Sequence, residues 1–193
     1  PLTLGATIYN LAREDGENFT YDDTTYVNNL EQLKQDADTM TLQVTQALNE
    51  HELTYLFGYG GYHRDQFNDP DFTAPMVASA TQNEDFDQYS HELRVASPQG
   101  ETFDYIAGLY YLDRKFSQDF INDGLGFNPV LAFSSTGYFN EDSTSYAAFG
   151  QLTWNISDSW RTSIGVRYSE ESKDASRWFL NRVFQSEASL AQA

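Results

Sequence analysis

The stretch YAAFGQLTWNISDSWRTSIGVRYS, residues 146–169, carries the clearest pattern in the chain. In its first half, apolar residues alternate strictly with mostly polar ones. The apolar set is Tyr146, Ala148, Gly150, Leu152, Trp154 and Ile156, and the mostly polar set is Ala147, Phe149, Gln151, Thr153 and Asn155. The alternation restarts at Trp160 after the short connection Ser157-Asp158-Ser159. Because successive side chains of a strand point to opposite faces, the stretch predicts a β-hairpin with one apolar face.

Two upstream stretches repeat this unit. The first surrounds the turn Asn49-Glu50-His51 and the second surrounds Pro98-Gln99-Gly100, where proline and glycine favour a turn. Weaker strand patterns occur at Leu4–Leu11, Thr20–Val27 and Trp178–Phe184. The chain is therefore predicted to be all-β, an antiparallel meander of long hairpins with about eight strands.

Long connections are predicted between the hairpins, at about residues 66–86 and 116–143, because these ranges hold Pro70, Pro75 and Pro129. Nothing resembles a linker, so residues 1–193 are interpreted as a single unit. Short turns that alternate with long loops are typical of an outer-membrane β-barrel, which has short periplasmic turns and long extracellular loops.

The charge and composition exclude several classes of function. With 29 acidic and 11 basic residues, the net charge of −18 argues against nucleic-acid binding, which needs a concentrated basic surface. The absence of cysteine excludes a disulfide framework and a thiolate metal site. No apolar run reaches the roughly 18 residues of a spanning helix, so any membrane crossing would use strands.

Aromatic residues recur eight positions apart on the apolar faces of the predicted strands. Eight residues span roughly 26 Å of strand, or about 20 Å along the normal of a barrel tilted by about 40°. This spacing suggests two aromatic girdles around a lipid-facing band, although the same alternation also fits the core of a soluble β-sandwich. The predicted membrane-facing girdle residues are Phe103, Tyr111, Tyr146, Trp154, Trp160 and Tyr168.

Charged residues at band height fall in the opposite alternation set, as the cost of placing charge in lipid requires. They are predicted to face the lumen of the barrel, and they are Glu92, Arg94, Asp104, Arg161 and Arg167.

Catalytic chemistry is not expected, and no cofactor is predicted. Ser90 and His91 are adjacent on one strand, so their side chains point to opposite faces and cannot act as a nucleophile and base pair. His63 and His91 are interpreted as girdle or loop histidines. Four loop carboxylates are weak candidates for a Ca²⁺ site, namely Asp69, Asp71, Asp85 and Asp87, but they lack EF-hand spacing. Solvated acidic loops are the default interpretation.

Three stretches also carry a family resemblance. Ser90–Pro98 with Phe103–Tyr111 resembles a barrel hairpin of TonB-dependent receptors, Ser145–Trp154 with Gly165–Asp174 resembles the next hairpin, and Leu42–Gln66 is similar to the preceding one. The resemblance covers most of residues 40–175 and implies uptake of scarce nutrients, such as iron chelates, cobalamin or glycans, across the bacterial outer membrane. The chain shows no counterpart of that family's plug domain. Its 193 residues are also too few for the 22-stranded barrel that the resemblance implies.

The first hypothesis is therefore a mid-barrel segment of such a receptor, without the plug domain. Its expected partners are outer-membrane lipid and the remainder of a larger barrel, together with a periplasmic energy-coupling protein if a plug exists. The alternative is an extracellular structural or adhesive sheet, derived from such a barrel, that pairs with copies of itself through its edges or faces. A complete eight-stranded barrel is a third possibility; its interior would need to be filled by side chains, and the small and charged inner residues argue mildly against it.

Overall fold

The computed structural model describes residues 31–70, 78–125, 131–157 and 159–185. These residues form six long strands and no helix. The strands are β1 (Gln32–Leu48), β2 (His51–Asn68), β3 (Ala78–Ala96), β4 (Phe103–Leu125), β5 (Leu131–Ser157) and β6 (Trp160–Gln185). The prediction of an all-β meander of long hairpins is confirmed.

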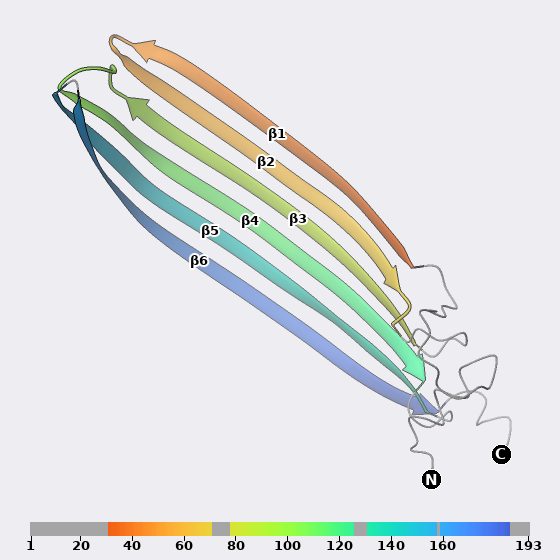
Figure 1. The fold of residues 1–193 in the computed structure, drawn as a ribbon. Coiled ribbons are helices and arrows are strands. Elements are labelled where there is room, and N and C mark those ends of the chain that lie inside the picture. Colours follow the sequence, from red (N-terminus) through yellow and green to blue (C-terminus); the bar gives the residue numbers. More distant parts are fainter. Residues whose placement is uncertain (1–30, 71–77, 126–130, 158, 186–193) are drawn as a thin grey trace, which may run out of the picture.

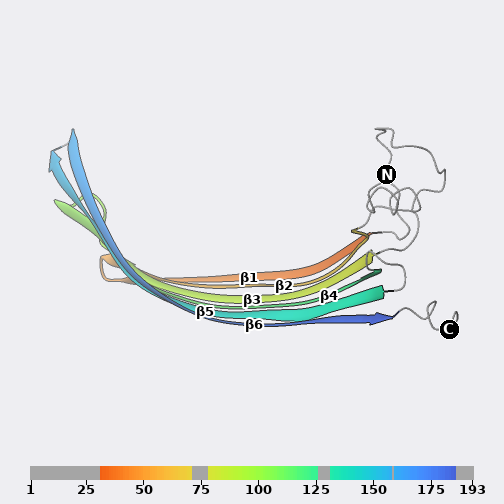
Figure 2. The ribbon, with the colours of Figure 1, turned by 90° about the horizontal axis from the view of Figure 1, so that it is seen from below.

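The six strands lie side by side in chain order, and each neighbouring pair is antiparallel (Figure 1). Within the described residues, β1 and β6 are the edge strands and pair on one side only. The sheet is bent rather than flat, with its turn-side ends sweeping out of the plane (Figure 2). No helix among the described residues is long and apolar enough to cross a membrane.

The tight turns lie where the sequence predicts them. Asn49 adopts a left-handed conformation with φ of 55° between β1 and β2, a conformation that asparagine tolerates. Gly100 has φ of 91° in the β3–β4 connection, and its amide donates to Asp104 over 3.0 Å. β5 and β6 are joined by the short connection between Ser157 and Trp160, next to an irregularity in the register between Asn155 and Ser157. All three connections lie at the same end of the sheet, here called the turn end, and the opposite end is called the loop end.

The sheet forms a single layer, so its described residues have almost no interior. Ala147 is the one apolar residue among them that is buried. Leu152, Ile164 and Val166 remain 42%, 72% and 76% exposed, whereas a β-sandwich would bury them against a second sheet. The sandwich interpretation is therefore wrong, and the apolar face is left open by the described part of the chain.

The strands extend far into the two ranges predicted as loops. β2 continues to Asn68 and β3 begins at Ala78, while β4 and β5 leave only the interval between Leu125 and Leu131. The predicted boundaries 66–86 and 116–143 were therefore too wide, because the backbone ladder continues through stretches that show no regular alternation of apolar and polar residues.

The weaker strand predictions have different outcomes. Trp178–Phe184 is the end of β6 and not a separate strand, whereas Leu4–Leu11 and Thr20–Val27 lie outside the described residues.

Candidate functional site

The register of the sheet places the apolar sets of all six strands on one common face. Leu93 pairs with both Tyr55 and Leu109, Leu109 pairs with Ala148, and Leu152 pairs with Ile164. Directly paired residues share a face, so these local patterns merge into one continuous surface. We call this surface the apolar face, and the opposite one the polar face.

An aromatic row bounds the apolar face at the turn end. Phe103 pairs with Trp154, and their rings stack with centroids 5.9 Å apart. Trp160 begins β6 at the same end and is 71% exposed. The three predicted girdle residues at this end therefore lie close together on one face.

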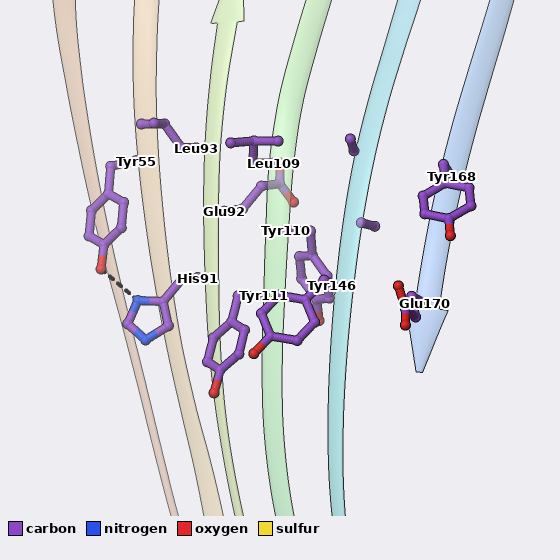
Figure 3. Close-up of a pocket in the computed structure, with 12 residues that line it drawn as sticks. Tyr55, His91, Glu92, Leu93, Leu109, Tyr110, Tyr111, Tyr146, Tyr168 and Glu170 are labelled. Carbon is purple, nitrogen blue, oxygen red and sulfur yellow. Dashed lines mark hydrogen bonds between the residues drawn. The ribbon is translucent and has the colours of Figure 1, made fainter. Parts of the chain in front are cut away.

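A second aromatic row crosses the apolar face eight residues further along the strands. Tyr111 pairs with Tyr146, with ring centroids 5.1 Å apart. Tyr168 pairs with Ala148, which is the next residue after Tyr146 on the same face of β5. The ring centroids of His91 and Tyr111 lie 5.9 Å apart. His91 Nδ1 and the Tyr55 hydroxyl share a hydrogen bond of 2.8 Å (Figure 3). The predicted girdle residues at this level are thus joined into a row that extends across β2 to β6.

Sequence analysis missed part of this second row, although the same alternation signal could have found it. The additional members are Tyr55, Phe57, Tyr59 and Tyr89, and they are joined by His91, which the sequence had indicated as a girdle or loop histidine. His91 stands in the row as an aromatic neighbour, and Ser90 lies on the polar face, where it pairs with Gly58.

Beyond the second row, toward the loop end, the apolar face becomes acidic. His63 lies between two carboxylates, with Nδ1 2.7 Å from Asp85 and Nε2 3.1 Å from Asp65. The hydrogen bond with Asp85 raises the pKa of His63, against a smaller opposing effect of desolvation. Other acidic residues of this zone are Asp36, Asp38, Asp87, Asp113, Asp142, Glu170 and Asp174. The chemical character of this face therefore changes sharply at the second aromatic row.

The polar face carries all five residues that were predicted to face a lumen. Glu92 and Arg94 form an ion pair at 2.8 Å, and Asp104 accepts a 2.8 Å hydrogen bond from the Asn155 amide. Arg161 and Asp104 line a hollow of about 590 Å³ near the turn end. The guanidinium of Arg167 lies over the rings of Tyr110 and Phe149, at 5.5 and 5.7 Å from their centroids.

Nearer the loop end, the polar face holds a buried carboxylate that sequence analysis did not identify. Glu84 is 5% exposed, and it lies 2.5 Å from Arg64 Nη2 and accepts hydrogen bonds from Gln82 and Gln118. Burial alone would raise the pKa of Glu84, but the hydrogen bonds from Gln82 and Arg64 outweigh it and hold the pKa below its usual value. The cluster was missed because residues 66–86 were assigned to a loop, which hides the pairing of β2, β3 and β4.

The candidate metal ligands do not converge. Asp85 and Asp87 lie on the apolar face, where they bind His63 and Tyr59, whereas Glu84 lies on the polar face. Asp69 is in the connection after β2, and Asp71 lies outside the described residues. In the parts of the chain that the structure describes, no three His, Cys, Asp or Glu side chains gather as a metal site requires.

The comparisons with known proteins agree with this geometry. The family model described as TonB dependent receptor-like, beta-barrel matches residues 2–188. The crystal structure of the ferric yersiniabactin uptake receptor FyuA from Yersinia pestis superposes with a TM-score of 0.58 at 21% identity, covering 78% of this chain and 25% of FyuA. This chain therefore spans about a quarter of that receptor.

Two other solved structures are much less similar. The KdgM porin in complex with oligogalacturonate gives a TM-score of 0.15 at 10% identity, covering 81% of this chain and 96% of the porin. OccK10 of Pseudomonas aeruginosa gives 0.15 at 11% identity, covering 77% of this chain and 60% of OccK10. These two likenesses carry no argument for the fold. No curated protein matches the chain in sequence.

Proposed function

The chain belongs to the TonB-dependent receptor-like β-barrel family, and on that premise we propose that it forms part of the wall of a bacterial outer-membrane receptor for a scarce nutrient. The observation that carries this proposal is the open apolar face, bounded on both sides by aromatic rows eight residues apart. A band of about 20 Å along the normal, with Trp and Tyr at its borders, fits the lipid-facing belt of a membrane barrel.

The orientation of the sheet in the membrane follows from the difference between its short turns at one end and its long strand extensions at the other. The turn end faces the periplasm, where such barrels have short turns. Beyond the second aromatic row, β4 continues from Tyr111 to Leu125 and β6 from Tyr168 to Gln185, so these strands project into the extracellular medium. At about 3.3 Å per residue, β4 extends roughly 46 Å past the row. This projection would form part of the outer mouth in which ligand is captured.

The polar face lines the lumen in this proposal. Its ion pairs between neighbouring strands, Arg64 with Glu84 and Arg114 with Glu141, would keep the projecting strands in register where no lipid supports them. The charges at band height, including Glu92 and Arg94, would contact whatever fills the barrel. A periplasmic energy-coupling protein of the TonB type would drive transport in the whole receptor.

An iron chelate is the nutrient that we propose first, because the structural neighbour FyuA takes up ferric yersiniabactin. Cobalamin and glycans are the other classes. The test uses a deletion of the gene and complementation by its full-length product. We expect the deletion to abolish growth on one ferric chelate as the sole iron source, and the purified product to bind that chelate. Unimpaired use of every chelate, with binding of cobalamin or a glycan instead, would move the function to that class.

Detergent dependence separates the receptor from a self-assembling extracellular sheet. A receptor wall exposes its apolar face to lipid, so the full-length product should fractionate with outer membranes and require detergent for extraction. A structural sheet would cover the same face with copies of itself and would be recovered as a soluble polymer. Recovery of that polymer would overturn the proposal.

A further inference from the structure

Aromatic side chains gather on the polar face of the projecting strands. Tyr62 of β2 pairs with Phe86 of β3, and their rings stack with centroids 5.2 Å apart. Phe86 also pairs with Phe116 of β4, whose ring centroid lies 6.1 Å from that of Phe139 on β5. These residues form a line across four neighbouring strands. Phe116 follows Tyr111 by five positions, so the line crosses β4 roughly 16 Å past the second aromatic row.

The line continues to β6 across a glycine. Gly137 of β5 pairs with Phe120 on one side and with Phe179 on the other, and the two ring centroids lie 5.9 Å apart. A Cβ at Gly137 would lie 2.8 Å from the Phe120 ring, so a larger residue would push this ring away. We call the whole set the aromatic track, and its members are Tyr62, Phe86, Phe116, Phe120, Phe139 and Phe179.

A cation without a carboxylate partner lies beside the aromatic track. Arg177 pairs with Phe139, and its guanidinium carbon lies 5.9 Å from the centroid of the Phe179 ring. Arg177 is exposed and forms no ion pair with any residue that the structure describes. The other basic residues on this part of the polar face, each close to a glutamate, are Arg64, Arg114 and Lys173. A negatively charged group on the track would therefore meet an unneutralised charge at Arg177.

The aromatic track is incompletely covered by the described sheet. Phe179 is 46% exposed, and the other rings of the track are half-buried against a single layer of strands. In the proposed function these strands project into the extracellular medium, where lipid does not reach the polar face. Covering apolar ring surface is favourable, and contact between aromatic rings adds to it. The track therefore favours a ligand that carries flat aromatic groups.

We propose that the aromatic track and Arg177 select, among iron chelates, those that carry aryl rings and a net negative charge. The inference deepens the proposed function and rests on it. The aryl rings would stack along the track, and an anionic oxygen of the ligand would accept hydrogen bonds from the Arg177 guanidinium. The contact with Phe179 would orient that guanidinium before the ligand arrives.

Charge and shape separate this class of ligand from its competitors. Cobalamin and neutral glycans carry no net negative charge, so they would leave Arg177 without an anionic partner. Ferric complexes of three hydroxamates are neutral and have no aryl ring, so they would match neither the track nor the cation. Specificity is a difference between affinities, and each competitor loses at least one of the two contacts.

The test measures binding to the purified full-length product in detergent by isothermal titration calorimetry. The aryl probes are the ferric complexes of a catecholate chelator and of a phenolate chelator. The competing probes are a ferric hydroxamate, cobalamin and a neutral malto-oligosaccharide. We expect one of the aryl chelates to bind at least tenfold more tightly than every competing probe.

Two matched pairs of variants locate the site. Arg177→Gln should weaken binding of the aryl chelate about tenfold to a hundredfold, as for a lost hydrogen bond to a charged group. Arg182→Gln removes the same charge from β6 but on the opposite face, where Arg182 pairs with Ser134, and should leave the affinity unchanged. Phe139→Leu keeps an apolar side chain without the ring and should weaken binding about twofold to tenfold. Tyr138→Leu makes a similar change on the opposite face of β5 and should have no effect.

Several results would overturn the inference. These are a competing probe that binds as tightly as the aryl chelates, and equal affinities within either matched pair of variants. In each of these cases the product still binds a nutrient, so the proposed function stands. Failure to bind any of the five probes, or recovery of the product without detergent, would count against the proposed function as well.

Discussion

Replacing Ile164 with arginine tests whether the apolar face contacts lipid. Ile164 lies midway between Trp160 and Tyr168 on β6, pairs with Leu152, and is 72% exposed in the described sheet. If water covered this face, the substitution would change the free energy of unfolding by about 0.5 kcal/mol or less. In the middle of a bilayer it should cost about 2 to 4 kcal/mol, or roughly 30- to 700-fold in the folding equilibrium.

The measurement uses the full-length product folded into phosphatidylcholine vesicles and titrated with urea, with the folded fraction read from its mobility on unheated gels. Ser163→Arg is the matched control, since Ser163 is adjacent but lies on the polar face, where it shares an exposed 2.8 Å hydrogen bond with Thr153. Thr162→Arg tests depth, because it lies nearer the turn-end aromatic row and should cost about 0 to 1 kcal/mol. Equal midpoints for the Ile164 and Ser163 variants would refute the reasoning.

Three further predictions concern the polar face and the extracellular projection. Gly108→Ala should destabilise the protein by about 1 to 3 kcal/mol in urea titrations, because the new Cβ would lie 2.5 Å from the Phe149 ring and 2.9 Å from the Leu93 carbonyl oxygen. Phe149→Leu should rescue only part of this loss, since the contact with the backbone of Leu93 remains, whereas Gly60→Ala meets no atom within 4 Å and should be neutral. The lowered pKa of Glu84 stabilises the folded state above its ordinary value of 4.5, and this contribution is lost as the pH falls through the lower folded value. The protection of amides in β2 to β4 against hydrogen exchange, after correction for the intrinsic exchange rate at each pH, should therefore fall on acidification, and Glu84→Gln should already show low protection at neutral pH. Because the pKa of His63 is raised, its protonated form stabilises the folded state below the ordinary pKa of 6.5, and this stabilisation is lost as the pH rises through the pKa of the folded state. NMR titration should therefore find a pKa above 6.5 for His63, and Asp85→Asn should lower it.

The chain alone determines which side chains share a face, wherever the two faces meet different surroundings. Between Tyr146 and Tyr168 the alternation is strict because one face is apolar and the other polar, and the register pairs the two sets as the alternation predicts, apart from an irregularity between Asn155 and Ser157. The turns at Asn49 and Gly100 were also predictable, since each holds a residue suited to positive φ.

Only the tertiary structure decided where the strands end. Past the second aromatic row polar residues and scattered aromatic residues occur on both faces, so residues 66–86 and 116–143 lack the alternation that predicts a strand, although the backbone ladder continues through most of them. The partners of Glu84 likewise come from three strands, and their distance along the chain hides them. Alternation is a local property of one strand, whereas pairing between strands is set by hydrogen bonds that any sequence of residues except proline can make.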